Sequence, residues 1–230
     1  MAGIADLFIE FIQKMIEFCY QAGAAAGFAN YGFAIILFTL IIKLAMYPLT
    51  RKQIQSTKAM QEIQPQMKAL QERYKNDKQR LQEETLKLYK ETGFNPLAGC
   101  LPLVAQMPVL MGIFFALKGF DYGGSPPSFL WMPSLAEPDP YYIMPVLSGL
   151  TTLAQSYYTM PDTSSGQNRM MLYFMPLFIG YISLQFAAGL VLYWVTTNIL
   201  QVAQQFWHAR GDRREAAAKT GQKSTSKRRP

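Results

Sequence analysis

Formal charge is confined to a few segments of this chain, and the stretches between them carry almost none. Four stretches stand out: 31–50, which contains only Lys43, and then 97–117, 140–161 and 170–207. About 20 apolar residues in an α-helix, rising roughly 1.5 Å per residue, cross the hydrocarbon core of a bilayer. The pattern therefore predicts a membrane protein, although 50% hydrophobic and 16% charged residues would also suit a soluble domain.

The last of these stretches, residues 170–207, is too long for a single crossing. It has room for two short helices with a turn near residues 185–189. We therefore expect an all-α integral membrane protein with five transmembrane helices, at about 31–50, 97–117, 140–161, 170–184 and 188–207. The fourth helix would cover only about 20 Å, so we expect neighbouring helices to shield it or the bilayer to thin beside it.

Lysine and arginine set the expected orientation, because basic residues of short loops stay on the cytoplasmic side. Of the 22 basic residues, ten lie in 51–93, eight follow Trp207, and Arg169 lies between the third and fourth spans. Five crossings place all three of these segments on one side. The amino terminus is therefore expected outside and the carboxyl terminus inside.

Three further segments lie outside the expected spans. Residues 1–30 have a helical repeat of apolar residues opposite charged ones, which suits either an amphipathic helix on the outer membrane surface or a helix packed against the spans. Residues 51–93 read as a cytoplasmic helical hairpin, with Asp77 capping the second helix and Gly93 ending it. Residues 208–230 form a basic tail that we expect to be disordered.

The hairpin and the tail each allow a functional and a purely structural interpretation. Met60 and Met67 on the hairpin could give adaptable contacts to varied partners, or could simply pack. The tail could bind ribosomal RNA or anionic lipid by neutralising phosphates, or could serve only as a topology anchor.

We find no pattern of residues that indicates an enzyme. Cys19 and Cys100 are expected on opposite sides of the membrane, and the single histidine, His208, would lie at the inner end of the last span. No nucleophile motif, paired carboxylate site or phosphate-binding loop is evident. We therefore assign no catalytic residue, no metal ligand and no cofactor.

Lys43 most strongly suggests a functional site, because a charge inside a span is costly and normally faces a protein interior or a water-filled cavity. Thr39 lies one turn before it, and the two could meet Gln106 and Asn198 from later spans. Such a cavity, open to the cytoplasm, could hold a polar segment of another chain. Alternatively, Lys43 reaches the inner interface by extending its side chain, as lysine often does.

Several motifs in order give the chain a resemblance to the YidC-type membrane protein insertases, which include the mitochondrial Oxa and chloroplast Alb proteins. Any one of them is weak, but together they span about residues 31–207. The motifs are residues 43–50 (KLAMYPLT), Met60 with Gln64-Pro65, Leu88-Tyr89, Asn95-Pro96-Leu97, residues 99–102 (GCLP), Gln106-Met107-Pro108, and residues 189–194 (GLVLYW) with Asn198.

The resemblance implies a five-helix core with a groove open to the cytoplasm and to lipid. The family usually has arginine where this chain has Lys43, so the charge is kept but the forked geometry of a guanidinium is lost. By position, Thr39 and Trp194 would contact the passing segment, and Gln106 and Asn198 would line the groove. The chain is similar to short bacterial members that have no large outside domain.

The function implied by the resemblance is insertion of newly made membrane proteins into the bacterial cell membrane, alone or beside the Sec translocon. Expected partners are nascent membrane proteins and membrane lipids, and the ribosome could be reached by the tail or the hairpin; DNA is not expected. Two other functions remain open. One is a small transporter or channel with Lys43 as an anion or proton site, and the other is an assembly scaffold without insertion activity.

Overall fold

The structure is a computed structural model that describes residues 2–93, 97–118, 127–159 and 166–226. Within these ranges it contains no strand, only an isolated bridge between Phe129 and Met132, so the expected all-α class is confirmed for the described residues. The helices are α1 (Ala2–Ala25), α2 (Tyr31–Ala45), α3 (Tyr47–Arg73), α4 (Lys78–Thr92), α5 (Leu97–Lys118), α6 (Ile143–Thr159), α7 (Gly166–Ser183) and α8 (Ala188–Ser226).

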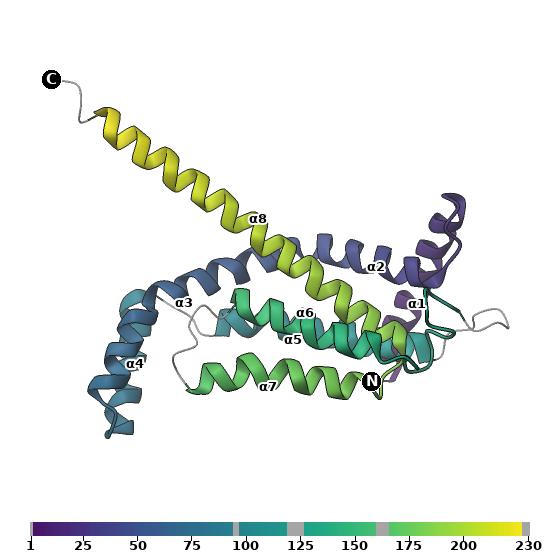
Figure 1. Cartoon of the computed structure of the whole chain (residues 1–230), viewed down its shortest axis with the longest axis horizontal. Coiled ribbons are helices and arrows are strands. Elements are labelled where there is room, and N and C mark those ends of the chain that lie inside the picture. The colour runs from purple at the N-terminus through teal and green to yellow at the C-terminus, as the bar shows by residue number, and fades with distance from the viewer. Residues whose placement is uncertain (1, 94–96, 119–126, 160–165, 227–230) are drawn as a thin grey trace.

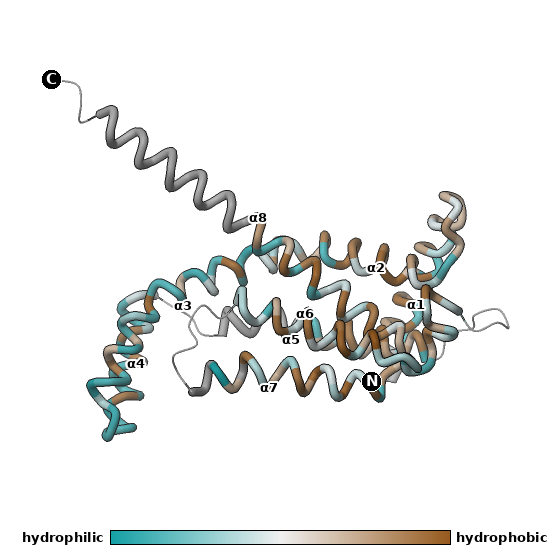
Figure 2. The backbone as a smooth tube through the Cα atoms, viewed as in Figure 1, coloured by the Kyte–Doolittle hydropathy of each residue, from teal (hydrophilic) through white to brown (hydrophobic). Residues whose placement is uncertain are grey.

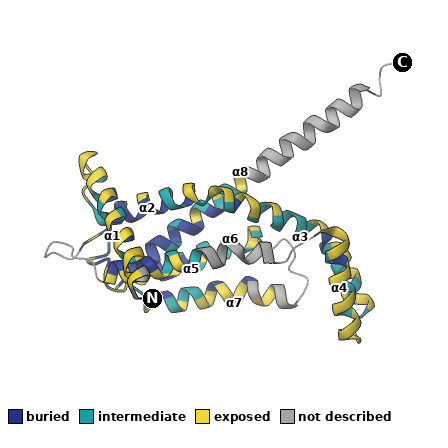
Figure 3. Cartoon of the chain, turned by 180° about the vertical axis from the view of Figure 1, so that it is seen from behind, coloured by how far each residue is buried: buried dark blue, intermediate teal, exposed yellow. Residues whose placement is uncertain are grey.

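Five of the helices, α2 and α5–α8, lie along one another and form a bundle (Figure 1). The α3–α4 hairpin extends from one end of the bundle, and α8 also leaves the bundle at that end, whereas α1 lies at the opposite end. The hairpin is mainly hydrophilic and the bundle is rich in hydrophobic residues (Figure 2). Burial is greatest where α2 and α8 pack, and α4 and much of α7 are exposed (Figure 3).

No single helix among the described residues is both long enough and apolar enough to cross a bilayer. Only α2 and α3 together have that length and apolarity, and this pair is bent by 67°. Shorter apolar helices cover residues 106–118 and 172–183. The five predicted spans therefore remain predictions, although each overlaps one helix of the bundle.

The first predicted span, residues 31–50, is broken into two helices at Met46. Pro48 has no N–H to donate and its ring would crowd the carbonyl of Leu44, so a straight helix through this point is disfavoured. Instead, the Met46 N–H donates to Ile42 O at 2.9 Å and closes α2, and α3 starts at Tyr47. Lys43 consequently lies in the last turn of α2 rather than within a continuous helix.

The hairpin has the end signals expected from its sequence. Asp77 accepts a hydrogen bond from the Arg80 N–H at 3.0 Å, which satisfies one of the free donors at the start of α4. Gly93 follows α4 with a φ of 66°, a left-handed conformation that glycine adopts without steric cost. Pro65 lies inside α3 and does not end it.

Helix α1 packs against the bundle, which is one of the two interpretations of residues 1–30. One stripe, formed by Ile12, Ile16 and Cys19, is buried in the core of the bundle. The side chain of Gln13 also donates to Ala116 O in α5 at 3.1 Å. A second apolar stripe that includes Phe11 and Phe18 stays exposed. The helix is therefore packed against α2 and α5 and still presents an apolar surface, as a helix at a membrane interface would.

The segment before α6, residues 127–142, packs over the start of α8. Backbone hydrogen bonds join Gly189 N to Leu135 O at 2.9 Å and Ala188 N to Glu137 O at 2.8 Å. The side chain of Leu135 is completely buried beneath this contact. The segment thereby covers the bundle at the end opposite the hairpin.

Asp139 holds the covering segment in shape. Its buried carboxylate accepts hydrogen bonds from the N–H groups of Tyr141 and Met144, at 3.1 and 2.7 Å, and from Trp131 Nε1 at 3.2 Å. Burial alone would raise the pKa of Asp139, but these hydrogen bonds outweigh burial and lower the pKa below its ordinary value. The carboxylate therefore starts α6 and fixes the preceding segment at the same time.

The carboxyl end differs from the expected disordered tail, because α8 continues to Ser226. The sequence Glu215-Ala216-Ala217-Ala218-Lys219 consists of strong helix formers, so a helix anchored in the bundle can extend through it at little cost. The side chains of Cys100 and His208, for which we predicted positions on the inner side, lie outside the described residues.

Replacing Asp139 with asparagine should destabilise the protein at pH 7 by about 2 kcal/mol, because an amide accepts fewer of these hydrogen bonds and adds N–H groups without acceptors. Folding lowers the pKa of Asp139. The carboxylate therefore makes its full contribution to the free energy of unfolding above the ordinary pKa of aspartate, and this contribution is lost as the pH falls through the pKa of the folded state. Thermal unfolding of both proteins at pH 7 and at about pH 3 checks this. A stability difference that stays constant between these pH values would contradict it.

Candidate functional site

Lys43 is a cation enclosed by the bundle, with 8% of its surface exposed. Its Nζ donates to Gln201 Oε1 on α8 at 3.3 Å, and no carboxylate among the described residues lies within ion-pair distance. Lys43 lies two residues before the end of α2, and a positive charge in the last turn of a helix is favoured by the helix dipole. The break at Met46 therefore places the lysine where a helix end can stabilise it.

A polar cavity of about 340 Å³ surrounds the lysine. It is formed by the junction of α2 and α3 together with residues of α5, α6, α7 and α8. Ten of the 16 residues that line the cavity carry a hydroxyl or an amide group. These groups belong to Thr50, Gln53, Gln106, Thr152, Gln155, Ser156, Thr159, Thr197, Asn198 and Gln201.

Thr152 on α6 is the acceptor that joins α6 to α8. Its Oγ1 accepts from Trp194 Nε1 at 3.1 Å and from Asn198 Nδ2 at 3.0 Å. Two turns nearer the hairpin end, Gln205 Nε2 donates to Thr159 Oγ1 at 3.2 Å. Polar residues at helical spacing on α8 thus face a matching row on α6, and the cavity wall is fixed by hydrogen bonds.

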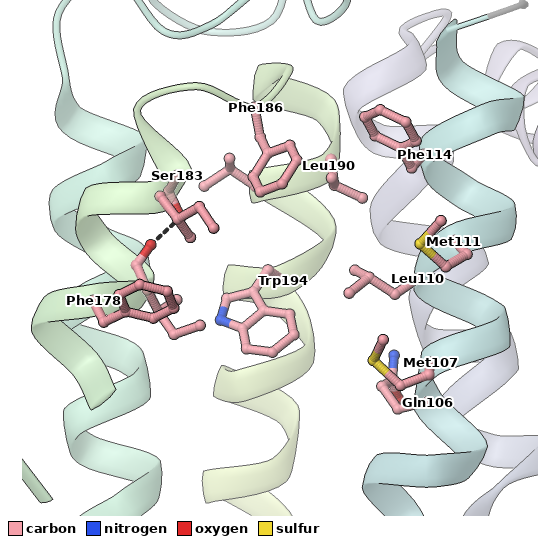
Figure 4. Close-up of a pocket in the computed structure, with 13 residues that line it drawn as sticks. Gln106, Met107, Leu110, Met111, Phe114, Phe178, Ser183, Phe186, Leu190 and Trp194 are labelled. Carbon is pink, nitrogen blue, oxygen red and sulfur yellow. Dashed lines mark hydrogen bonds between the residues drawn. The ribbon is translucent and has the colours of Figure 1, made fainter. Parts of the chain in front are cut away.

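An apolar pocket of about 450 Å³ adjoins the polar cavity (Figure 4). Met107, Met111 and Phe114 of α5 line one side of it, and Phe178 and Phe186 line the other. Three residues, Gln106, Ile179 and Trp194, belong to the walls of both spaces. The two spaces therefore lie side by side, separated by these shared residues, and the chain offers polar and apolar surfaces next to each other.

Gln106 and Trp194 are oriented at this boundary by polar contacts. Gln106 Nε2 donates to the hydroxyl of Tyr193, which is itself almost completely buried. The Trp194 indole turns its N–H toward Thr152 in the polar cavity while the same residue lines the apolar pocket. Each residue can thus contact both the polar and the apolar part of a bound segment.

Four of the residues predicted for the groove, Lys43, Gln106, Trp194 and Asn198, line the same cavity. Thr39 does not: it is completely buried, and its hydroxyl donates to Ile35 O of its own helix at 2.6 Å. The two hairpin methionines lie on α3, outside both spaces, with Met60 exposed and Met67 half-buried.

The sequence reasoning missed Thr152 and Gln201 as parts of the site. A signal for Gln201 was available, because it follows Asn198 by three residues and Trp194 by seven, which places all of them on one face of a helix. Thr152 carried no such signal, since its role as an acceptor depends on how α6 packs against α8.

Comparison with known sequences gives consistent matches. The family model of the 60Kd inner membrane protein matches residues 23–215. The membrane protein insertase YidC of Caldanaerobacter subterraneus is 41% identical over 196 residues, covering 85% of this chain and 91% of the relative. The membrane protein insertase MisCA of Bacillus subtilis is 43% identical over 183 residues, covering 77% of this chain and 69% of the relative.

Some curated relatives are much longer than this chain. The membrane protein insertase YidC of Syntrophus aciditrophicus is 43% identical over 178 residues, which are 77% of this chain and 32% of the relative. The chain thus spans about a third of that relative's length. A crystal structure of an active YidC insertase with its first transmembrane domain resolved is similar with a TM-score of 0.69 at 27% identity, covering 86% of this chain and 46% of that one.

Replacing Asn198 with alanine should destabilise the protein by about 2 kcal/mol, because Thr152 and Thr151 lose a donor in a buried position. Its neighbour Ile199 is exposed, so Ile199→Ala serves as the matched control and should change the stability by less than about 1 kcal/mol. Thermal unfolding in the same detergent measures both variants. Equal losses in the two variants would show that the α6–α8 hydrogen bonds contribute little.

Proposed function

This chain belongs to the YidC family of membrane proteins, and on that premise we propose that it is an insertase of the bacterial cell membrane. It would accept nascent membrane proteins in the cavity around Lys43 and release their apolar helices into lipid. The observation that carries this proposal is a buried, carboxylate-free cation in a polar cavity that adjoins an apolar pocket.

We place the bundle across the membrane with five spans, the amino terminus outside and the carboxyl terminus inside. The hairpin and the carboxyl end of α8 are the two most basic segments, and both leave the bundle at the same end (Figure 1). The proposed orientation requires this, because it places both segments in the cytoplasm. The segment 127–142 and α1 lie at the other end, which we assign to the outside. The exposed apolar stripe of α1 would then rest in the outer interface.

The polar cavity lowers the barrier for a hydrophilic segment of a substrate. Such a segment resists entering hydrocarbon, because its backbone and side-chain polar groups lose their hydrogen bonds to water. Inside the cavity, hydroxyl and amide groups replace those hydrogen bonds, and Lys43 attracts a carboxylate in surroundings less polar than bulk water. The remaining distance through hydrocarbon is thereby shortened.

The apolar pocket provides the exit for the hydrophobic part of the substrate. A segment that passes Trp194 and Gln106 leaves hydroxyl and amide groups and meets Met107, Met111 and Phe178. Methionine side chains are unbranched and flexible, so they can fit helices of different sequence. Movement from the pocket into lipid then follows from burial of apolar surface and requires no covalent chemistry.

Contacts with the ribosome and the Sec translocon belong to the same proposal. The supporting features are the ten basic residues of 51–93 and the eight that follow Trp207, all of which the proposed orientation exposes to the cytoplasm. Phosphate contacts made by these residues would weaken as the salt concentration rises. The exposed Met60 on the hairpin is available to an apolar partner.

Replacing Lys43 with alanine should slow the insertion of a single-span substrate with an acidic outside tail about tenfold, because the cavity loses its attraction for the carboxylates. Lys43→Arg should retain insertion, since the charge is kept and the cavity of about 340 Å³ has room for a guanidinium. The measurement is protection of the tail from protease in proteoliposomes of the purified protein.

The matched control is Lys14→Ala, which removes an exposed lysine from α1 and should leave insertion unchanged. If the native protein inserts no more substrate than empty liposomes do, the insertase proposal fails. Ion flux without insertion would instead support a transporter or channel, and substrate binding without insertion would support an assembly scaffold.

A further inference from the structure

We propose that Gln201 is a specificity-determining residue that holds Lys43 in position while leaving its charge uncompensated, so that the cavity prefers substrate segments bearing a carboxylate. This inference rests on the proposed insertase function and adds the residue that sets its substrate preference. It starts from the Lys43–Gln201 contact, which joins α2 to α8 across 158 positions of sequence.

The contact between these two residues is made inside the bundle. Lys43 and Gln201 are 8% and 9% exposed, and both line the polar cavity. A long lysine side chain has many rotamers, and a buried acceptor at 3.3 Å selects those that keep the ammonium in the cavity. Without that acceptor, the side chain is freer to extend toward the inner interface, away from the α6 and α8 walls.

The chemical nature of the partner matters as much as its position. An amide oxygen accepts a hydrogen bond but carries no formal charge, so the field of the ammonium remains in the cavity. A glutamate at position 201 would form an internal ion pair and cancel that field. Because no described carboxylate lies within ion-pair distance of Lys43, an incoming acidic side chain can displace the amide and gain the full charge interaction.

Thr152 contributes a second donor to the same cavity. Its oxygen already accepts hydrogen bonds from Trp194 and Asn198, which use its two lone pairs, so the hydroxyl hydrogen remains to be donated. No acceptor for that hydrogen lies among the hydrogen bonds of the described residues, and Thr152 lines the cavity. An ionised carboxylate accepts hydrogen bonds only and therefore matches a wall that offers an ammonium and a hydroxyl hydrogen.

The test compares two single-span substrates that differ only in their outside tails, one with aspartates and one with asparagines at the same positions. In proteoliposomes, Gln201→Glu should reduce insertion of the aspartate tail about tenfold and change insertion of the asparagine tail less than about twofold. Gln201→Asn keeps a neutral amide and should keep the native preference. Ala203→Glu is the matched control, because it adds a carboxylate at an exposed position of α8 that lines neither the cavity nor the apolar pocket, and it should also keep the preference.

An exchange of the two residues tests position and charge together. Lys43→Gln alone should abolish the preference for the aspartate tail, and the double variant Lys43→Gln/Gln201→Lys should restore it, because the cation then projects into the same cavity from α8. Size-exclusion profiles and thermal unfolding identify any variant that does not fold, and a misfolded variant would lower insertion of both tails equally.

The outcomes separate this inference from the function on which it rests. If the native protein inserts neither tail above empty liposomes, the insertase proposal fails and this inference fails with it. If the native protein inserts both tails, but Gln201→Glu and the exchange leave the ratio of aspartate to asparagine insertion unchanged, only the role of Gln201 is overturned.

Discussion

The enclosure of one uncompensated cation among apolar helices is the constraint on which the site depends. A lysine in such surroundings requires nearby polar groups, because the free energy of removing its charge from water is otherwise not recovered. The chain meets this requirement in two ways. The break at Met46 places Lys43 in the last turn of α2, and hydroxyl and amide groups of α6 and α8 form the cavity around it.

The junction of a polar and an apolar space follows from the same packing. Trp194 lies in both walls, with its indole N–H bound to Thr152 and its ring facing Met107 and Phe178 across the pocket. A segment with a polar part and an apolar part can then keep each part against a wall of matching polarity as it moves.

The two ends of the bundle are built differently. The segment 127–142 is hydrogen-bonded to the start of α8, is fixed by Asp139 and covers one end with buried side chains such as Leu135. At the other end the chain extends as the hydrophilic α3–α4 hairpin. In the proposed orientation the covered end faces the outside and the hairpin end faces the cytoplasm, so a polar segment would enter from the hairpin end.

The sequence by itself determined the all-helical class, the caps at Asp77 and Gly93, and the presence of a cation within an apolar stretch, because these depend on local periodicity and composition. It also supplied the ordered motifs of the family. Only the tertiary structure decided that Gln201 accepts from Lys43, that Thr152 joins α6 to α8, and that Thr39 turns to its own backbone. Periodicity defines which residues share a face of one helix, but the partner of that face depends on the packing of all helices together, where several polar faces could have met Lys43.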